Sequence, residues 1–177
     1  MHILDIVENS IKAEARKIAV TIEESKKKDL ISVKIEDDGK GMDKKTKARA
    51  LDPFFSTKKE RRIGLGLSLL REAAKAAGGR FSLESKPNEG TRVEATFQAS
   101  HIDTKPLGDI SQTLITLIMG NPGVDFAYSH TTDESDFSMD TAEIKAQLNG
   151  IPIHSPEVLN IIKNKIKEGL DNLRRLT

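Results

Sequence analysis

Cysteine is absent from the 177 residues, and so is any long apolar run. Without cysteine, disulfide bonds and thiolate metal sites are excluded, and a reducing compartment is the natural one. No apolar segment approaches the ~20 residues needed to span a bilayer. The N-terminus also lacks the basic-then-apolar pattern of a secretion signal. We therefore predict a cytoplasmic protein without a membrane partner.

A strong charge of either sign is absent too, because 28 basic and 27 acidic residues leave a net charge of +1. Nucleic-acid-binding domains carry a marked positive excess, so we predict no nucleic-acid partner. Hydrophobic residues make up 37% and charged residues 31%, which suits a globular fold with a modest core. The length allows one domain with a small appendage.

The first hundred residues show alternating helical and strand periodicity. A helix is predicted over 1–16, with Leu4, Val7, Ile11 and Ala15 as its buried stripe. The further predicted elements are strands at 17–24 and 30–38 that pair as a hairpin, a short helix at 44–51, a helix at 64–79, and strands at 80–86 and 91–100. This order predicts an α+β fold, a two-layer α/β sandwich with helices on one face of an antiparallel or mixed sheet.

The pattern changes after His101, so we predict one domain over 1–101 and an α/β extension of unknown role over 102–177. The extension should hold a helix at 108–123, a hairpin with a solvated acidic tip at 124–141, and a final helix capped by Ser155. That final helix is amphipathic. It is expected to pack against its own domain, with a homodimer or a partner-binding helix as the alternative.

Two polar patterns stand out in the first domain. The segment DDGKGMD, residues 37–43, places two carboxylates and two glycines directly after an apolar strand. It fits a surface turn or the rim of a nucleotide pocket. Asp5, Asn9 and Lys12 share one face of the first helix at i, i+4 and i+7, where they could also be merely solvated.

A third pattern lies at the start of the second long helix. Gly64 and Gly66 fall where unpaired backbone amides attract phosphate. Such glycines more often serve turns. The preceding loop adds four basic residues, a run that is usually only a wet surface but here directly precedes the glycines: Lys58, Lys59, Arg61 and Arg62.

The blocks DIVENSIKA, DDGKGM, DPFFSTK with GLGLSLL, and EGTRVEATF stand in a definite order. They resemble the asparagine, phenylalanine and three glycine boxes of the ATP-binding domain shared by histidine kinases, DNA gyrase, the large heat-shock chaperones and MutL mismatch-repair proteins. The resemblance covers residues 1–99, and the spacing of PFFSTK and GLGLSLL is most similar to the histidine-kinase branch. It implies a Bergerat-type ATP-binding fold with ATP and Mg²⁺ as ligands.

The resemblance implies a role for each matching position. Asn9 would supply an amide oxygen to a Mg²⁺ that bridges the ATP phosphates, and Lys12 would contact phosphate. Asp5 stands where hydrolysing relatives carry a glutamate that orients water. An aspartate is one methylene shorter, so its reach is in question.

At the base end, the resemblance makes Asp37 the acceptor for the adenine amino group. Gly39 and Gly41 would leave room for the flat base, and Thr91 would reach the same bridging water. The resemblance places further nucleotide contacts at Met42, Lys58, Gly64, Leu65, Gly66 and Leu67. Phe54 and Phe55 would anchor the basic loop that follows them, which would act as a lid over the nucleotide.

These roles imply an ATP-binding regulatory protein with an unidentified protein partner. Because the first box starts at residue 5, we expect no phospho-acceptor hairpin before it and no self-phosphorylating sensor kinase. A protein kinase acting in trans or a slow ATPase remain candidates. The alternative is a nucleotide-sensing module without chemistry, whose ATP-ordered lid controls the partner.

Overall fold

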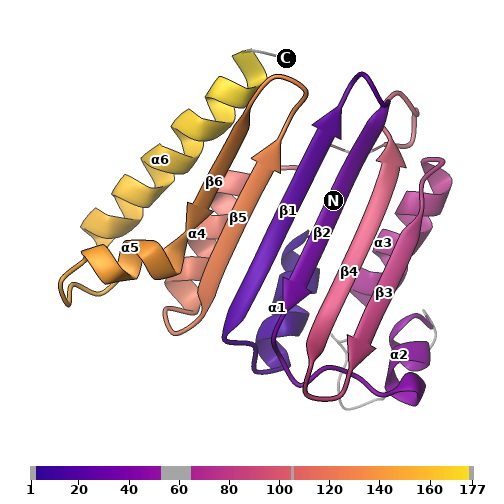
Figure 1. The fold of residues 1–177 in the computed structure, drawn as a ribbon, viewed down its shortest axis with the longest axis horizontal. Helices are drawn as coiled ribbons and strands as arrows, with labels where there is room; N and C mark the ends of the chain where they lie inside the picture. Colours follow the sequence, from indigo (N-terminus) through magenta and orange to yellow (C-terminus); the bar gives the residue numbers. More distant parts are fainter. Residues whose placement is uncertain (1–2, 53–64, 105, 176–177) are drawn as a thin grey trace.

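The computed structural model describes residues 3–52, 65–104 and 106–175 (Figure 1). In chain order, the elements are α1 (Ile3–Lys12), β1 (Lys17–Ser25), β2 (Leu30–Asp37), α2 (Lys44–Ala50), α3 (Leu65–Ala76), β3 (Phe81–Lys86), β4 (Gly90–Gln98), α4 (Ile110–Gly120), β5 (Asp125–Thr131), β6 (Asp136–Asp140), α5 (Thr141–Gln147) and α6 (Pro156–Arg175). The predicted α+β class is confirmed.

The strands form one sheet in the order β3-β4-β2-β1-β5-β6. Neighbouring strands run antiparallel except β1 and β5, which are parallel. The predicted hairpins β1–β2, β3–β4 and β5–β6 are all present. The sheet is therefore mixed, as the sequence allowed.

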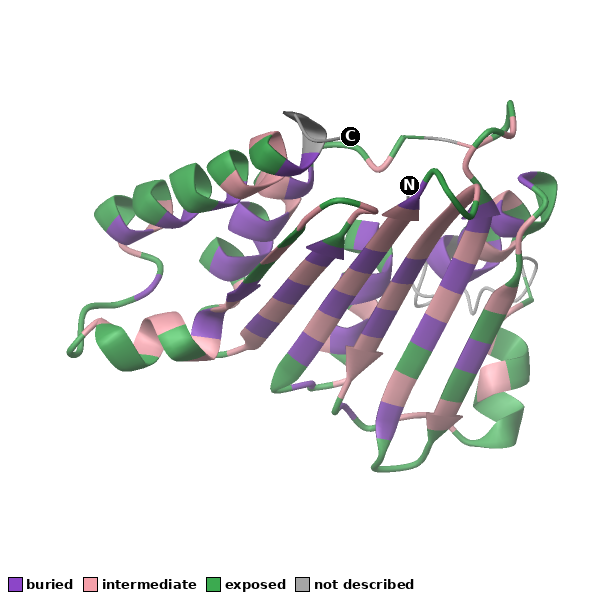
Figure 2. Cartoon of the chain, turned by 45° about the horizontal axis from the view of Figure 1, so that its top comes forward, coloured by how far each residue is buried: buried purple, intermediate pink, exposed green. Residues whose placement is uncertain are grey.

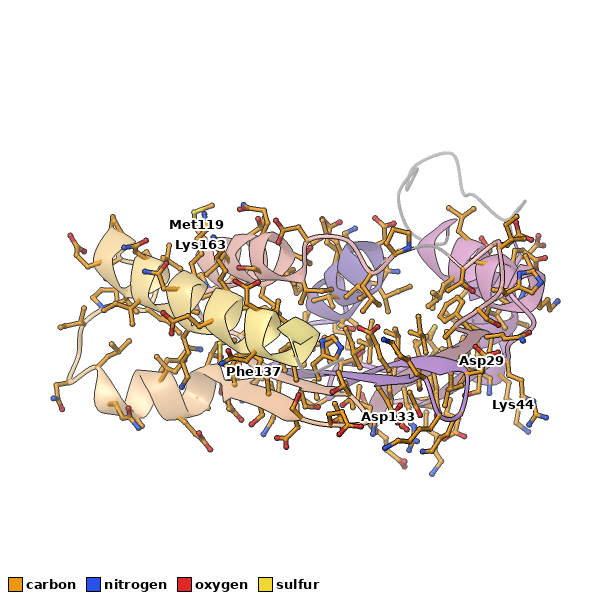
Figure 3. The ribbon with its side chains drawn as sticks, turned by 90° about the horizontal axis from the view of Figure 1, so that it is seen from above. Asp29, Lys44, Met119, Asp133, Phe137 and Lys163 are labelled. Carbon is orange, nitrogen blue, oxygen red and sulfur yellow. The ribbon has the colours of Figure 1, made fainter. Side chains whose placement is uncertain are left out.

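The core lies on one face of the sheet. Helices α1, α3, α4 and α6 lie on the same side of it (Figure 3). Alternate residues of the strands are buried, as the banding in Figure 2 shows. In β1, Ile18 and Ile22 are 0% exposed, whereas Thr21 between them faces the polar, half-buried side.

The buried face of α1 differs from the predicted stripe. Ile3, Ile6, Val7 and Ser10 are buried, whereas Leu4 is 36% exposed. The prediction is confirmed for Val7 and Ala15 but was wrong for Leu4, because it avoided the polar position Ser10. Ser10 completes the i, i+3, i+4, i+7 pattern, since its hydroxyl finds a hydrogen-bond partner inside the fold.

The C-terminal segment continues the sheet of the first hundred residues. β5 pairs with β1 along its whole length, from Lys17 opposite Asp125 to Glu23 opposite Thr131. One buried cluster extends over both parts of the chain. The division into a domain at 1–101 and an extension at 102–177 stays a prediction, with the two parts joined by this shared sheet.

The final helix packs against its own sheet, as expected. Ile162, Ile166 and Leu173 of α6 are buried, and α6 contacts α4 and β6. Phe137 lies beneath α6 (Figure 3). A Cβ atom on Gly169 would overlap its ring, so glycine lets the helix approach β6 closely. Pro156 opens the helix, but the hydroxyl of Ser155, the predicted cap, makes no hydrogen bond within the described residues.

Helix α5 was missed by the sequence reasoning. Only its first residue, Thr141, fell within a predicted element, the hairpin at 124–141, and its other residues were assigned to none. The Asp140 carboxylate caps it by accepting a hydrogen bond from the Ala142 amide at 2.7 Å, and Glu143 lies in its first turn. An aspartate followed three residues later by glutamate is a helix-start signal that could have revealed it.

Asp133 is half-buried and connects two hairpin tips, whereas the acidic tip was predicted to be solvated. Its carboxylate accepts hydrogen bonds from the Ser25 hydroxyl at 2.6 Å and the Lys27 amide at 2.9 Å. These two bonds hold the pKa of Asp133 below its ordinary value of 3.8, and the bond from Ser25 has the larger effect. The acidic turn of β5–β6 is thereby tied to the β1–β2 turn.

Asp133→Asn is expected to lower the free energy of unfolding at neutral pH. Since the folded-state pKa is depressed, the contribution of the carboxylate is present above pH 3.8 and is lost as the pH falls through the lower folded value. Denaturation of variant and wild type across pH 2–7 measures this. The two curves should converge only at the acid end, and Asp136→Asn, an exposed carboxylate at the start of β6, should leave stability unchanged. A gap of constant size at every pH would contradict the assignment.

Candidate functional site

Three polar side chains lie in a row across the end of the sheet. Asp37 is the last residue of β2 and pairs with Thr91 of β4, which in turn pairs with Ser85 of β3. Residues paired across strands project to the same face. All three therefore point toward the helical layer, on the side of α1.

The two oxygens of Asp37 are each held by a protein donor. The Ser10 hydroxyl donates to Oδ2 at 2.6 Å, and the Gly39 amide donates to Oδ1 at 2.9 Å. Ser10 is only 4% exposed. Sequence reasoning missed this contact. The available signal was a serine on the buried face of an amphipathic helix, which needs an internal partner.

A cavity of about 240 Å³ opens beside Asp37. It runs between α1, the loop after β2, α2, the start of α3 and β4. Asn9, Lys12 and Thr91 contribute polar groups to its lining. The remaining walls are largely apolar and come from Ile6, Ala13, Met42, Ala50, Leu67 and Val93. The Asp37 carboxylate, the Asn9 amide and the Lys12 amine thus line one cavity.

Of the residues predicted to face the phosphates or the Mg²⁺ ion, Asn9 and Lys12 line this cavity. Asn9 is half-buried, and Lys12 is exposed, with its ammonium 3.7 Å from the Glu8 carboxylate one turn earlier. Asp5 is exposed and is not part of the described lining. Its Cβ would lie 2.8 Å from a Cβ placed on Gly66, so this glycine keeps α3 close to α1.

The glycines after Asp37 are required by the fold itself. A Cβ on Gly39 would lie 2.8 Å from the Ala13 carbonyl oxygen. Gly41 has a φ of +62°, and a Cβ there would overlap the Lys86 carbonyl. Asp38 is structural as well, since its Oδ1 accepts from the Arg16 and Lys17 amides at 2.8 Å.

Several predicted site residues lie outside the described part of the chain. These are Lys58 and Gly64, together with the proposed lid anchors Phe54 and Phe55. Leu65 begins α3, but only its backbone is described. The structure therefore brings together Asn9, Lys12, Asp37, Gly41, Met42, Leu67 and Thr91 around one cavity.

No group of three or more histidine, aspartate or glutamate side chains is arranged as a metal site in residues 3–52, 65–104 and 106–175. Over the same residues, no helix combines the length and apolar character of a membrane span.

Comparison with known proteins adds independent findings. Residues 2–101 match the family described as histidine kinase-, DNA gyrase B-, and HSP90-like ATPase. The Non-motile and phage-resistance protein of Caulobacter vibrioides is 32% identical over 112 residues, which is 58% of this chain and 13% of that protein. The Alginate biosynthesis sensor protein KinB of Pseudomonas aeruginosa is 27% identical over 89 residues, which is 50% of this chain and 15% of that protein.

Among solved structures, the N-terminal domain of a DNA repair protein matches with a TM-score of 0.49 and 17% identity, covering 77% of this chain and 50% of that one. The matched segment is less than a fifth of the length of each of these two relatives. The family match spans more than half of the chain and includes the elements that surround the cavity. The chain therefore belongs to the histidine kinase-, DNA gyrase B- and HSP90-like ATPase family.

Proposed function

We propose that the cavity beside Asp37 binds ATP and that nucleotide binding by this chain regulates a partner protein. The observation that carries the proposal is the Asp37 carboxylate, held by Ser10 and Gly39 at the end of an apolar cavity. A half-buried acceptor beside apolar walls suits a flat base that donates a hydrogen bond from an amino group. Adenine has that chemistry.

Two polar residues of the lining fit the phosphates. Asn9 offers a hard oxygen ligand, and Lys12 offers a positive charge. A Mg²⁺ ion bound with the nucleotide would neutralise phosphate charge and hold the phosphate oxygens. With Asn9 as its protein ligand, it would take its other ligands from phosphate and water, which is common for Mg²⁺.

Two classes of activity follow from ATP binding. A protein kinase acting in trans or a slow ATPase would use Asp5 to orient the attacking group. A nucleotide-sensing module would need no such base. Asp5 is exposed and is not among the residues that line the cavity, which supports the sensing module. The similarity to sensor proteins supports a role in signal transduction for either class.

Calorimetric titration with ATP, with and without Mg²⁺, tests the binding proposal. Asn9→Ala is expected to weaken ATP binding by roughly ten-fold when Mg²⁺ is present, because one ligand of the ion is lost. With Mg²⁺ chelated, variant and wild type should bind alike. An equal loss of ATP affinity with and without Mg²⁺ would indicate that Asn9 supports the fold rather than the ion.

Turnover of labelled ATP separates the two activities. Hydrolysis or transfer of label to a co-purified protein, abolished by Asp5→Asn, would favour the enzyme. ATP-dependent capture of a partner, undiminished by Asp5→Asn and without turnover, would favour the sensing module.

A further inference from the structure

Ser85 has a complete set of hydrogen bonds behind the wall of the cavity. Its Oγ accepts from the Met42 amide at 2.8 Å and lies 2.9 Å from the Gly90 carbonyl oxygen. It also lies 2.9 Å from the Thr91 hydroxyl. Ser85 is not itself among the residues that line the cavity, whereas Thr91 is.

Counting protons fixes the direction of these bonds. A serine hydroxyl has one proton to donate, and a carbonyl oxygen can only accept. The contact with the Gly90 carbonyl therefore uses the Ser85 proton. The contact between the two hydroxyls must then use the proton of Thr91, which leaves the Thr91 oxygen with only lone pairs to offer the cavity.

The protons of the groups around Asp37 can be assigned in the same way. The Ser10 proton is directed at Asp37 rather than at the cavity, and so is the Gly39 amide proton. An ionised carboxylate is itself an acceptor only. At the base end, Asp37 and Thr91 thus both present acceptors.

We propose that Ser85 is a positioning residue that sets the hydrogen-bond polarity of Thr91, so that the base end of the cavity selects a 6-aminopurine and rejects a 6-oxopurine. This inference rests on the proposed ATP binding. A 6-amino group donates to acceptors, whereas a 6-oxo group is itself an acceptor and can make no hydrogen bond to Asp37 or Thr91. Without Ser85, Thr91 becomes free to donate, and the rejection weakens.

The test compares binding of ATP and inosine triphosphate, which carries a 6-oxo group, by calorimetry in each variant. The affinity ratio cancels any general loss of folded protein. Wild type should prefer ATP by at least ten-fold, and Ser85→Ala should lower this ratio by roughly three- to ten-fold. Ser82→Ala, on the same strand but exposed, is the matched control and should leave the ratio unchanged.

A second background shows whether Ser85 acts through Thr91. Thr91→Val should itself lower the ratio, and adding Ser85→Ala to it should change nothing further. The inference would be overturned if Ser85→Ala left the ratio of the two affinities unchanged. It would also be overturned if Ser85→Ala lowered that ratio equally in the wild type and in Thr91→Val. Neither result would contradict ATP binding itself. Failure of the wild type to bind ATP at millimolar concentration would instead overturn the proposed function, and this inference with it.

Discussion

Asp37→Asn is expected to weaken ATP binding by roughly ten- to a hundred-fold, the loss of one hydrogen bond to a charged acceptor. The wild-type carboxylate receives the Ser10 hydroxyl on one oxygen and the Gly39 amide on the other. An asparagine has a single acceptor oxygen. The Gly39 amide can only donate, so it claims that oxygen and turns the –NH₂ group toward Ser10 and the base.

The fold should survive this change. The Ser10 hydroxyl can rotate, accept from the new –NH₂ group and donate to the Ile6 carbonyl, which already lies 3.4 Å away. Calorimetry gives the affinity, and thermal denaturation reports the fold. Glu36→Gln, the neighbouring position on the opposite face of β2, should bind ATP as the wild type does. Binding that is unaffected by Asp37→Asn would refute base recognition by this carboxylate.

Gly41→Ala is expected to lower the free energy of unfolding by about 2–4 kcal/mol and to abolish measurable ATP binding. The positive φ disfavours any side chain at this position, and the new methyl group would overlap the Lys86 carbonyl. The loop and the β3–β4 turn are hydrogen bonded through the Asn88 amide and the Lys40 carbonyl at 2.7 Å. Moving the loop breaks this contact and displaces Met42 from the cavity wall.

Gly123→Ala is the matched control, since a Cβ there meets nothing within 4 Å and its backbone is not left-handed. Chemical denaturation should separate the two variants clearly. If Gly41→Ala kept full stability and lost only ATP binding, the glycine would serve the nucleotide rather than the packing of the loop on the β3–β4 turn.

Local patterns were sufficient for most of the fold. Strand alternation predicted β1 to β6, because a residue that faces the core must be apolar and its neighbour faces the polar side. The buried side of α3, formed by Leu67, Leu70, Ala74 and Ala77, followed from helical spacing in the same way. The features that local patterns failed to predict were a short helix and a buried polar residue. The seven residues of α5 carry too little periodicity, and Ser10 looked too polar for a buried stripe.

In the candidate site, too, some features follow from the sequence and others only from the tertiary structure. The sequence by itself determined that Asp37, Asn9 and the glycines occur in the order of an ATP-binding family, because that order is a property of the chain. Only the tertiary structure decided which donors hold Asp37, that Ser85 stands behind Thr91, and that β5 joins the sheet beside β1. Those contacts link residues far apart in sequence, and their partners are chosen by strand register and helix packing, which no local pattern encodes.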